Sequence, residues 1–208
     1  MDTVLIFAGG DSPGLEVIED LPQADLVVAA DGGYDSATRL GVVVDVVVGD
    51  LDSISTTELP HRIVVERHPR DKDATDLELA LELVARDRPD RVVVVGGSGG
   101  RLDHELATAA LLCSPRWRGF DELDWITERG RAHVVWRRRV LHGDVGATVT
   151  LLPVGGDAEG IHTRGLRWNL EGERLAVGSS RGVSNVMEAP VADIRLASGC
   201  LLVVIPNP

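Results

Sequence analysis

The sequence predicts an α/β protein in which a three-layer parallel-sheet domain is followed by a small all-β sandwich domain. Two observations predict this order. Over roughly the first 127 residues, short β-branched runs alternate with helical patterns. After about residue 130 only short strand-like runs remain, separated by Gly, Pro, Asp and Asn. We therefore place the domains at residues 1–129 and 130–208.

Valine-rich, nearly continuous apolar runs define the first domain. We expect strands at residues 4–9, 26–30, 44–49, 62–66, 91–97 and 123–127, and helices at 13–20, 34–40, 75–87 and 102–112. Such strands, separated by helices, are typical of a parallel sheet covered on both faces, a Rossmann-like arrangement. Ligands of such sheets bind beyond the carboxyl ends of the strands.

The second domain shows no helical period of useful length. We expect strands at residues 132–136, 148–154, 160–166, 174–180, 192–198 and 200–206. Short strands at this spacing are typical of a β-sandwich. Because a domain of fewer than 80 residues has a limited core and exposed edges, we expect it to pack against a partner subunit.

Composition excludes several classes of protein. The net charge of −12 argues against a nucleic-acid partner, because the phosphate backbone is bound by basic surfaces. No apolar run approaches the roughly 18 residues of a membrane span, and the N-terminus lacks the basic region of a signal peptide. Cys113 and Cys200 form no C-x-x-C pair. We expect a reduced cytoplasmic protein with no membrane association.

Polar segments rich in Asp and Gly follow four successive strands of the first domain. They are Asp31-Gly32-Gly33, residues 49–53 (GDLDS), residues 71–76 (DKDATD) and residues 96–104 (GGSGGRLDH). If the sheet is parallel, all four segments lie along one edge of it. Carboxylates brought together there repel each other by about 4 kcal/mol per close pair at an effective dielectric constant near 20.

Raised pKa values or a divalent cation would relieve that repulsion. A site with oxygen donors and no thiolate suits Mg²⁺, which takes its remaining ligands from water and substrate phosphates. Glycines let backbone N–H groups approach an anion, and Arg101 can add a bidentate phosphate contact. Neither the Walker pattern nor the dinucleotide pattern can be read from residues 96–104.

Each segment also has a simpler explanation when it is taken alone. Asp31-Gly32-Gly33 fits a turn, residues 96–100 fit a flexible loop, and Asp50 with Asp52 fits a solvated pair. Asp73 fits a helix N-cap with Asp76 at the third helical position. The coincidence of four such segments at successive strand ends favours a functional site.

Two further residues stand out within these segments. Lys72 is the only lysine among 21 basic residues, and it is interpreted either as a mobile phosphate contact or as a partner of its acidic neighbours. His104 lies near a helix start beside Asp103, and no H-E-x-x-H partner accompanies it. Its role is left open.

With these residues assembled, the sequence resembles the thiamine pyrophosphokinase (thiamin diphosphokinase) family. Six elements carry the resemblance, in order along nearly the whole chain: ADGGYD (30–35), VVVGDLDSI (46–54), DKDATDLELAL (71–81), VVGGSGGRLDHELA (94–107), GLRWNLEGERLAVG (165–178) and GVSN (182–185). The resemblance implies an ATP- and Mg²⁺-binding catalytic domain, a thiamine-binding β-sandwich, and a homodimer with active sites between subunits. It also implies transfer of a pyrophosphoryl group from ATP to the hydroxyethyl oxygen of thiamine, giving thiamine diphosphate and AMP.

The resemblance also assigns site residues. It implies catalytic roles for Asp50, Asp52, Asp76 and Asp103; ATP contacts from Asp31, Gly32, Lys72, Asp73, Arg101 and His104; Mg²⁺ ligation by Asp31, Asp50, Asp52 and Asp76; and thiamine contacts from Trp168, Ser184 and Asn185. Two alternatives stay open from the residues alone. One is a Mg²⁺-dependent nucleotide phosphohydrolase or phosphotransferase, and the other is a non-catalytic nucleotide or thiamine sensor.

Overall fold

A computed structural model describes residues 2–11, 13–56 and 58–207 of the chain. The chain divides into two units, residues 1–108 with 119–128, and residues 109–118 with 129–208. Helix α3 (Leu102–Leu112) runs across this division. Within the described ranges, no helix has both the length and the apolar composition needed to cross a membrane.

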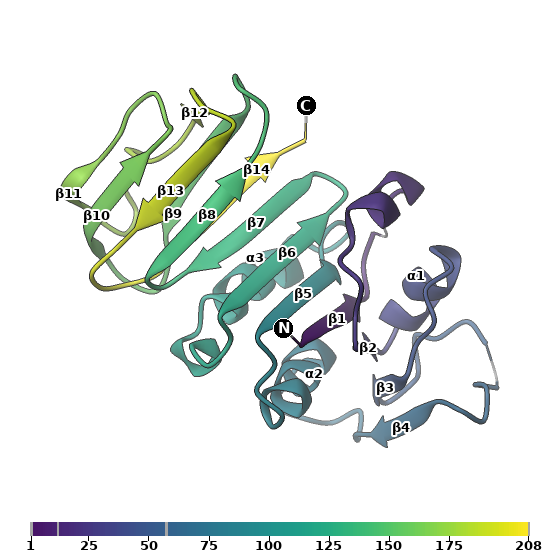
Figure 1. The fold of residues 1–208 in the computed structure, drawn as a ribbon. Coiled ribbons are helices and arrows are strands. Elements are labelled where there is room, and N and C mark those ends of the chain that lie inside the picture. Colours follow the sequence, from purple (N-terminus) through teal and green to yellow (C-terminus); the bar gives the residue numbers. More distant parts are fainter. Residues whose placement is uncertain (1, 12, 57, 208) are drawn as a thin grey trace. The chain divides into compact units, whose positions relative to one another are not determined.

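The first unit contains a six-stranded parallel sheet (Figure 1). Its strands are β1 (Thr3–Ala8), β2 (Leu26–Ala30), β3 (Val46–Gly49), β4 (Val64–Arg67), β5 (Arg91–Gly96) and β6 (Glu122–Thr127). Their spatial order is β6-β5-β1-β2-β3-β4, and every neighbouring pair is parallel. The direction in which the chain adds strands therefore reverses between β1 and β5, the position at which ligands bind in open sheets of this kind.

Alternation along the strands places apolar side chains on both faces of this sheet. Leu5 and Phe7 of β1 belong to a buried cluster that includes Ala37 of helix α1 (Gly33–Arg39). Helix α2 (Asp76–Ala85) contacts β1, β2 and β3 through its own buried residues. These are Leu77, Ala80, Leu81 and Val84, at the i, i+3, i+4, i+7 spacing of one helix face. The predicted α/β class is confirmed.

Two local details of this unit refine the patterns of the sequence. The helix expected at residues 13–20 is present over Leu15–Asp20, as a six-residue 3₁₀ helix, η1, between Pro13-Gly14 and Pro22. The N-cap of α2 is Thr75, whose side chain accepts a hydrogen bond from Glu78 N at 3.2 Å. The sequence T-x-x-E here is that of a capping box, and Asp73 lies outside it.

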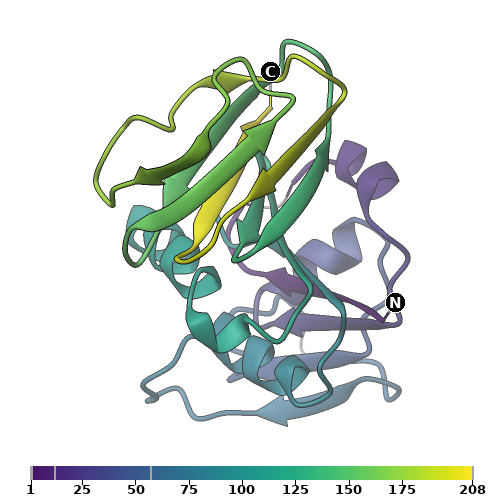
Figure 2. The same cartoon turned by 60° about the vertical axis from the view of Figure 1, so that its left-hand side comes forward.

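Residues 129–208 of the second unit form antiparallel strands in two sheets, visible from two sides in Figures 1 and 2. Its strands are β7 (Gly130–Val135), β8 (Arg138–His142), β9 (Thr148–Pro153), β10 (Ala158–Arg164), β11 (Glu171–Leu175), β12 (Asn185–Val186), β13 (Val191–Arg195) and β14 (Leu201–Pro206). Within this unit the orders are β12-β9-β14-β7 and β11-β10-β13-β8. The predicted all-β architecture is confirmed.

Burial alternates along these strands, as a sandwich requires. In β9, Val149 and Leu151 point into the core, and in β8 Leu141 does so between exposed neighbours. The expected strand at 174–180 is wrong, because β11 ends at Leu175 and the chain then turns through Gly178, which has φ 80°. The two-residue strand β12 is too short to give a sequence pattern.

The short helix η2 (Pro115–Trp117) precedes β6.

Candidate active site

The loops that follow β1 and β5 meet at the position where the strand order reverses. Gly97 N donates to Gly9 O, and Asp11 N donates to Ser98 O, both at 2.8 Å. A Cβ on Gly10 would lie 2.5 Å from Ser98 O, so these two loops touch only because the position is glycine. The result is a closely packed double loop of backbone amides at the carboxyl ends of β1 and β5.

The first of these loops was not predicted from the sequence. Residues 96–104 were predicted to bind a ligand, but the Gly-Gly-Asp segment at residues 9–11 was given no role. The available signal was its position, because this segment directly follows a buried strand, as Asp31-Gly32-Gly33 does. Pairing it with residues 96–100 required knowing that β1 and β5 are neighbours.

Asp31, Asp50 and Asp52 come together at the carboxyl ends of β2 and β3. One carboxylate oxygen from each lies within 4.8 Å of the others. Asp31 has φ 44°, and Leu51, between the other two aspartates, has φ 68°. Left-handed backbone at residues other than glycine is strained and clusters at functional sites. The structure thus places three predicted metal ligands in one group.

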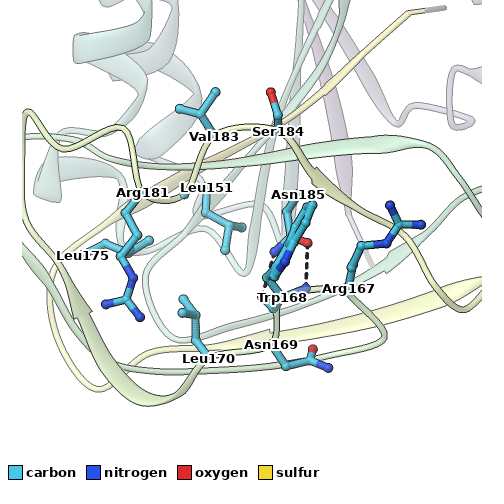
Figure 3. A pocket seen from close by; sticks show the side chains of 11 residues that line it. Leu151, Arg167, Trp168, Asn169, Leu170, Leu175, Arg181, Val183, Ser184 and Asn185 are labelled. Atoms are coloured by element: carbon cyan, nitrogen blue, oxygen red, sulfur yellow. Dashed lines mark hydrogen bonds between the residues drawn. The ribbon is translucent and has the colours of Figure 1, made fainter.

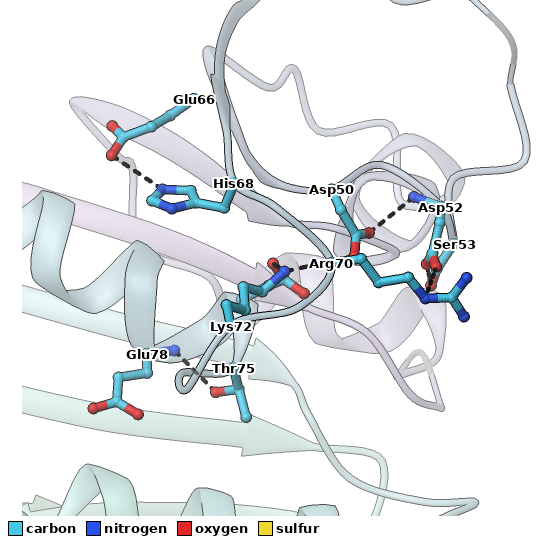
Figure 4. Close-up of polar contacts among 10 residues, drawn as sticks. Asp50, Asp52, Ser53, Glu66, His68, Arg70, Lys72, Thr75 and Glu78 are labelled. Carbon is cyan, nitrogen blue, oxygen red and sulfur yellow. Dashed lines mark hydrogen bonds and ion pairs between the residues drawn. The ribbon is translucent and has the colours of Figure 1, made fainter.

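Hydrogen bonds within the loop orient two of these carboxylates (Figure 4). Asp52 N donates to Asp50 Oδ1 at 3.1 Å, and Ser53 Oγ donates to Asp52 Oδ1 at 3.0 Å. The Asp52 amide, with the Lys72 ammonium as a further contribution, holds the pKa of Asp50 below its ordinary value. Asp50 is therefore ionised throughout the physiological range, as a metal ligand must be.

Lys72 lies between two of the predicted site carboxylates. Its Nζ is 2.9 Å from Asp76 Oδ1 and 3.6 Å from Asp50 Oδ2, and its side chain is only 13% exposed. Burial alone would lower the pKa of Lys72, but the Asp76 and Asp50 carboxylates outweigh burial and raise it. Burial raises the pKa of Asp76, although Lys72 opposes that change.

Gly49, the last residue of β3, makes this arrangement sterically feasible. Its φ is 141°, and a Cβ there would lie 2.7 Å from Asp76 Oδ1 and 3.1 Å from Asp31 Cβ. The acidic side chains thus occupy the space that any larger residue would fill. Gly32 is the N-cap of α1, and a Cβ on it would lie 3.4 Å from Ser53 Cβ. Gly32 therefore lies next to the loop that carries Asp50 and Asp52.

The remaining predicted residues of this unit lie at the start of α3 or on the surface. Arg101 and Asp103 form a two-bond ion pair, with Nε–Oδ1 at 3.1 Å and Nη2–Oδ2 at 2.5 Å. This hydrogen-bonded partner lowers the pKa of Asp103 to about 2. Asp73 and His104 are exposed, and neither belongs to the three-carboxylate group.

The three-carboxylate group fits a hard divalent cation. Its donors are all oxygens, as Mg²⁺ prefers. Asp31 is 8% exposed, and among the described residues its Oδ1 has no hydrogen-bond partner. A buried, unpartnered carboxylate oxygen is costly unless it binds a cation or a proton. The side chains present therefore match the predicted metal.

The second unit contains a pocket of about 650 Å³ in which all three predicted thiamine residues lie (Figure 3). Its lining consists of Leu151, Arg167, Trp168, Asn169, Leu170, Leu175, Arg181, Gly182, Val183, Ser184 and Asn185. The Trp168 side chain is 57% exposed, so an apolar ring faces solvent at the pocket. The Arg167 guanidinium lies 5.7 Å from the centre of that ring.

The segment 182–185 passes closely over β9. A Cβ on Gly182 would lie 2.1 Å from Leu151 O, and Ser184 has φ 59°, with its N–H donating to Thr150 Oγ1 at 3.0 Å. Asn185 is buried, and its carboxamide bonds the backbone of Trp168. The sequence analysis missed the apolar wall of the pocket, because its leucines look like ordinary core residues.

Known proteins resemble this chain in sequence. The family model described as "Thiamin pyrophosphokinase, catalytic domain" matches residues 19–120, and the one described as "Thiamin pyrophosphokinase, vitamin B1 binding domain" matches residues 138–201. Thiamine pyrophosphokinase 1 of Oryza sativa subsp. japonica is 28% identical over 200 residues, covering 80% of this chain and 73% of the rice protein. Thiamine pyrophosphokinase of Bacillus subtilis is 34% identical over 122 residues, covering 54% and 55%.

Solved structures share the fold. A crystal structure of thiamine pyrophosphokinase from Bacillus subtilis superimposes with a TM-score of 0.85 at 22% identity over the full length of both chains. The Candida albicans enzyme superimposes with a TM-score of 0.79 at 14% identity, covering 99% of this chain and 90% of that one. The two family models match the two parts of the chain in the expected order. The chain belongs to the thiamin pyrophosphokinase family.

Proposed function

We propose that the chain transfers the pyrophosphoryl group of ATP to thiamine, giving thiamine diphosphate and AMP. The observation that carries this proposal is the group formed by Asp31, Asp50 and Asp52, with its buried, unpartnered oxygen, in a member of this family. Such a group at the carboxyl ends of parallel strands is suited to a metal-bound polyphosphate.

Asp31, Asp50 and Asp52 would hold Mg²⁺, which when bound supplies positive charge to the polyphosphate oxygens. The predicted fourth ligand, Asp76, instead lies against Lys72. We assign Lys72 to the ATP phosphates, because its ammonium is held at the acidic group by two carboxylates. The amides of the loops after β1 and β5 provide a further place for phosphate oxygens.

The reaction requires attack at the β-phosphorus. The thiamine hydroxyl oxygen forms a bond to that phosphorus, and the bond from it to the oxygen bridging the α-phosphorus breaks. AMP leaves with the bridging oxygen, and the hydroxyl proton passes to a base. Among the residues with implied catalytic roles, Asp76 is better suited to be this base than Asp103, because burial raises the pKa of Asp76 whereas Arg101 lowers that of Asp103 to about 2.

Thiamine is assigned to the pocket of the second unit. The exposed face of Trp168 provides a stacking surface for a flat cationic ring, and such contacts contribute about 0.5–2 kcal/mol. The family name of the second matched model, a vitamin B1 binding domain, supports this assignment. Ser184 contributes the exposed hydroxyl at the pocket.

A homodimer with shared active sites belongs to the same proposal and has its own test. Mixing Asp52→Asn and Trp168→Ala chains, at a thiamine concentration too low for either variant alone to turn over, should restore about a quarter of wild-type activity, since half of a random mixture is heterodimer with one intact site. Mixtures that stay inactive contradict shared sites. We also propose a cytoplasmic location, consistent with two free, buried cysteines, to be checked by cell fractionation.

Measuring AMP release from ATP and Mg²⁺, with and without thiamine, tests the reaction. The proposal expects AMP and thiamine diphosphate in equal amounts, and no AMP without thiamine. Orthophosphate release that ignores thiamine would instead identify a phosphohydrolase. Binding of both ligands with no AMP would identify a non-catalytic sensor.

A further inference from the structure

The backbone of Trp168 is held by a single side chain from a distant part of the sequence. Asn185 Oδ1 accepts a hydrogen bond from Trp168 N at 3.1 Å, and Asn185 Nδ2 donates one to Trp168 O at 2.8 Å. Both bonds are visible in Figure 3. The two residues are 17 positions apart, so the contact closes the segment 168–185 around one wall of the pocket.

The Asn185 carboxamide has little capacity left for a ligand. Its Oδ1 also accepts from Val186 N at 2.8 Å, so both of its acceptor positions are used. One of its two N–H donors is used by Trp168 O. The whole residue is only 6% exposed. The orientation of the amide is settled by these partners, since the oxygen faces two N–H groups and the nitrogen faces a carbonyl.

Trp168 itself has little other support. The residue is 57% exposed, and Arg167, whose guanidinium lies 5.7 Å from the centre of its ring, is paired with Glu188 at 3.2 Å. Arg167 N donates to Val186 O at 2.9 Å, which ties the preceding residue to β12 as well. The position of the ring therefore depends on how its backbone is anchored to residues 185 and 186.

We infer that Asn185 is a positioning residue that fixes the Trp168 ring for thiamine, and that it does not contact thiamine itself. This inference rests on the proposed function and revises the role implied for Asn185 by the family resemblance. In this pocket, Trp168 and Ser184 would contact the ligand, and Asn185 would hold the Trp168 ring in place.

Two substitutions test the role of Asn185 in different ways. Asn185→Ala removes every bond to Trp168. Asn185→Asp keeps an oxygen that accepts from Trp168 N and Val186 N. Its second oxygen, however, faces Trp168 O, so the hydrogen bond that Nδ2 donates there is lost and replaced by repulsion. Each should raise the thiamine KM by about tenfold and leave the ATP KM within about twofold, since one buried hydrogen-bonded contact is lost.

A double-mutant cycle with Trp168→Ala separates positioning from direct contact. If Asn185 acts only through Trp168, adding Asn185→Ala to Trp168→Ala should change the thiamine KM by less than about twofold, because the group being positioned is gone. If Asn185 contacts thiamine, the two effects should multiply. Multiplicative effects overturn the inference.

Thr163→Val provides the matched control. The Thr163 hydroxyl is buried, accepts from Leu170 N at 2.8 Å and donates to Asn169 Oδ1 at 3.3 Å, so it supports the same loop through residues other than Trp168. This variant should lose stability while the thiamine KM stays within about twofold of wild type. A rise as large as that of Asn185→Ala would show that general loosening of the loop explains the result, and would overturn the inference.

The indole N–H resonance of Trp168, assigned with Trp168→Phe, reports on the ring without any turnover. Asn185→Asp should shift or broaden this signal and leave those of Trp117, Trp125 and Trp136 in place. An unchanged Trp168 signal overturns the inference. If the wild-type chain binds no thiamine, the proposed function is contradicted. The indole signal alone then tests whether Asn185 positions the Trp168 ring.

Discussion

Left-handed backbone conformation occurs at single residues of both candidate sites. Among the described residues, four that are not glycine have positive φ, namely Asp31, Leu51, Arg88 and Ser184. Three of them lie at the acidic group or the pocket, and only Arg88 lies elsewhere, in a turn before Pro89. Strain of this kind costs about 1–3 kcal/mol per residue, so the surrounding structure must hold it in place.

Gly49→Ala should disable the acidic group without unfolding the protein. The added Cβ would lie 2.7 Å from Asp76 Oδ1, so the Asp76 and Asp31 side chains would have to move. Displacements of this size cost about 10²-fold in turnover. AMP formation, measured beside the thermal midpoint, checks the prediction.

Gly41→Ala is the matched control for that substitution. Gly41 also has positive φ, at 73°, but a Cβ there would meet nothing within 4 Å. It should lower stability by about 1 kcal/mol and leave turnover unchanged. Equal losses of turnover in both variants would mean that backbone strain, rather than the crowding of Asp76, causes the effect.

At the level of elements, the site depends on where helices and strands end. Helix α2 starts at Asp76 because Thr75 caps it, and Lys72 lies in the segment just before. The cap therefore fixes the position of Asp76, and with it the position at which Lys72 contacts Asp76. Strand β3 similarly ends at Gly49, so the next residues, Asp50 to Asp52, turn over the edge of the sheet.

Thr75→Ala should destabilise the first unit by about 1 kcal/mol, because Glu78 N loses its capping acceptor. Thr75→Ser keeps the hydroxyl and should stay within a few tenths of a kcal/mol of wild type, as serine caps helices about as well. Denaturant unfolding measures both variants. Equal midpoints for Thr75→Ala and wild type would contradict the capping role.

The strand pair β8–β13 carries a pH-dependent contribution to stability. Asp193 bonds Arg195 and Arg138, and these two guanidinium groups, Arg195 first, lower its pKa to about 2. Because the folded-state pKa lies below the ordinary value of 3.8, this stabilisation is complete above about pH 4 and is lost as the pH falls toward 2.

Asp193→Asn should accordingly be less stable than wild type at pH 6, and the difference should shrink between pH 4 and about pH 2. Thermal unfolding of both proteins at several pH values measures this. A difference that stays constant across that range would assign the loss to packing rather than to charge.

Sequence patterns predicted most of the strands because their physical cause is local. The valine runs of β3 and β5 are buried on both faces, which leaves a signal that needs no knowledge of neighbours. The acidic group could be predicted for a related reason, since parallel strands place their carboxyl ends along one edge. The loop at residues 9–11 and the Asn185 contacts could not, because they depend on strand order and on side-chain orientation.

At the scale of the whole molecule, the chain assigns different chemistry to each of its two units. The first provides carboxylates, one lysine and glycine loops, and the second provides an aromatic pocket built on antiparallel strands. The net charge of −12 therefore does not describe either site. Screening beyond about 8 Å means that local groups decide what each site binds.

The Mg²⁺ dependence of AMP formation, compared between wild type, Asp31→Asn and Asp52→Asn, tests the account most directly. Removing one carboxylate from the group should raise the Mg²⁺ concentration for half-maximal rate by at least about tenfold and lower the maximal rate by about 10²-fold, while the fold is kept. Variants with wild-type Mg²⁺ dependence and near-normal turnover would contradict the account.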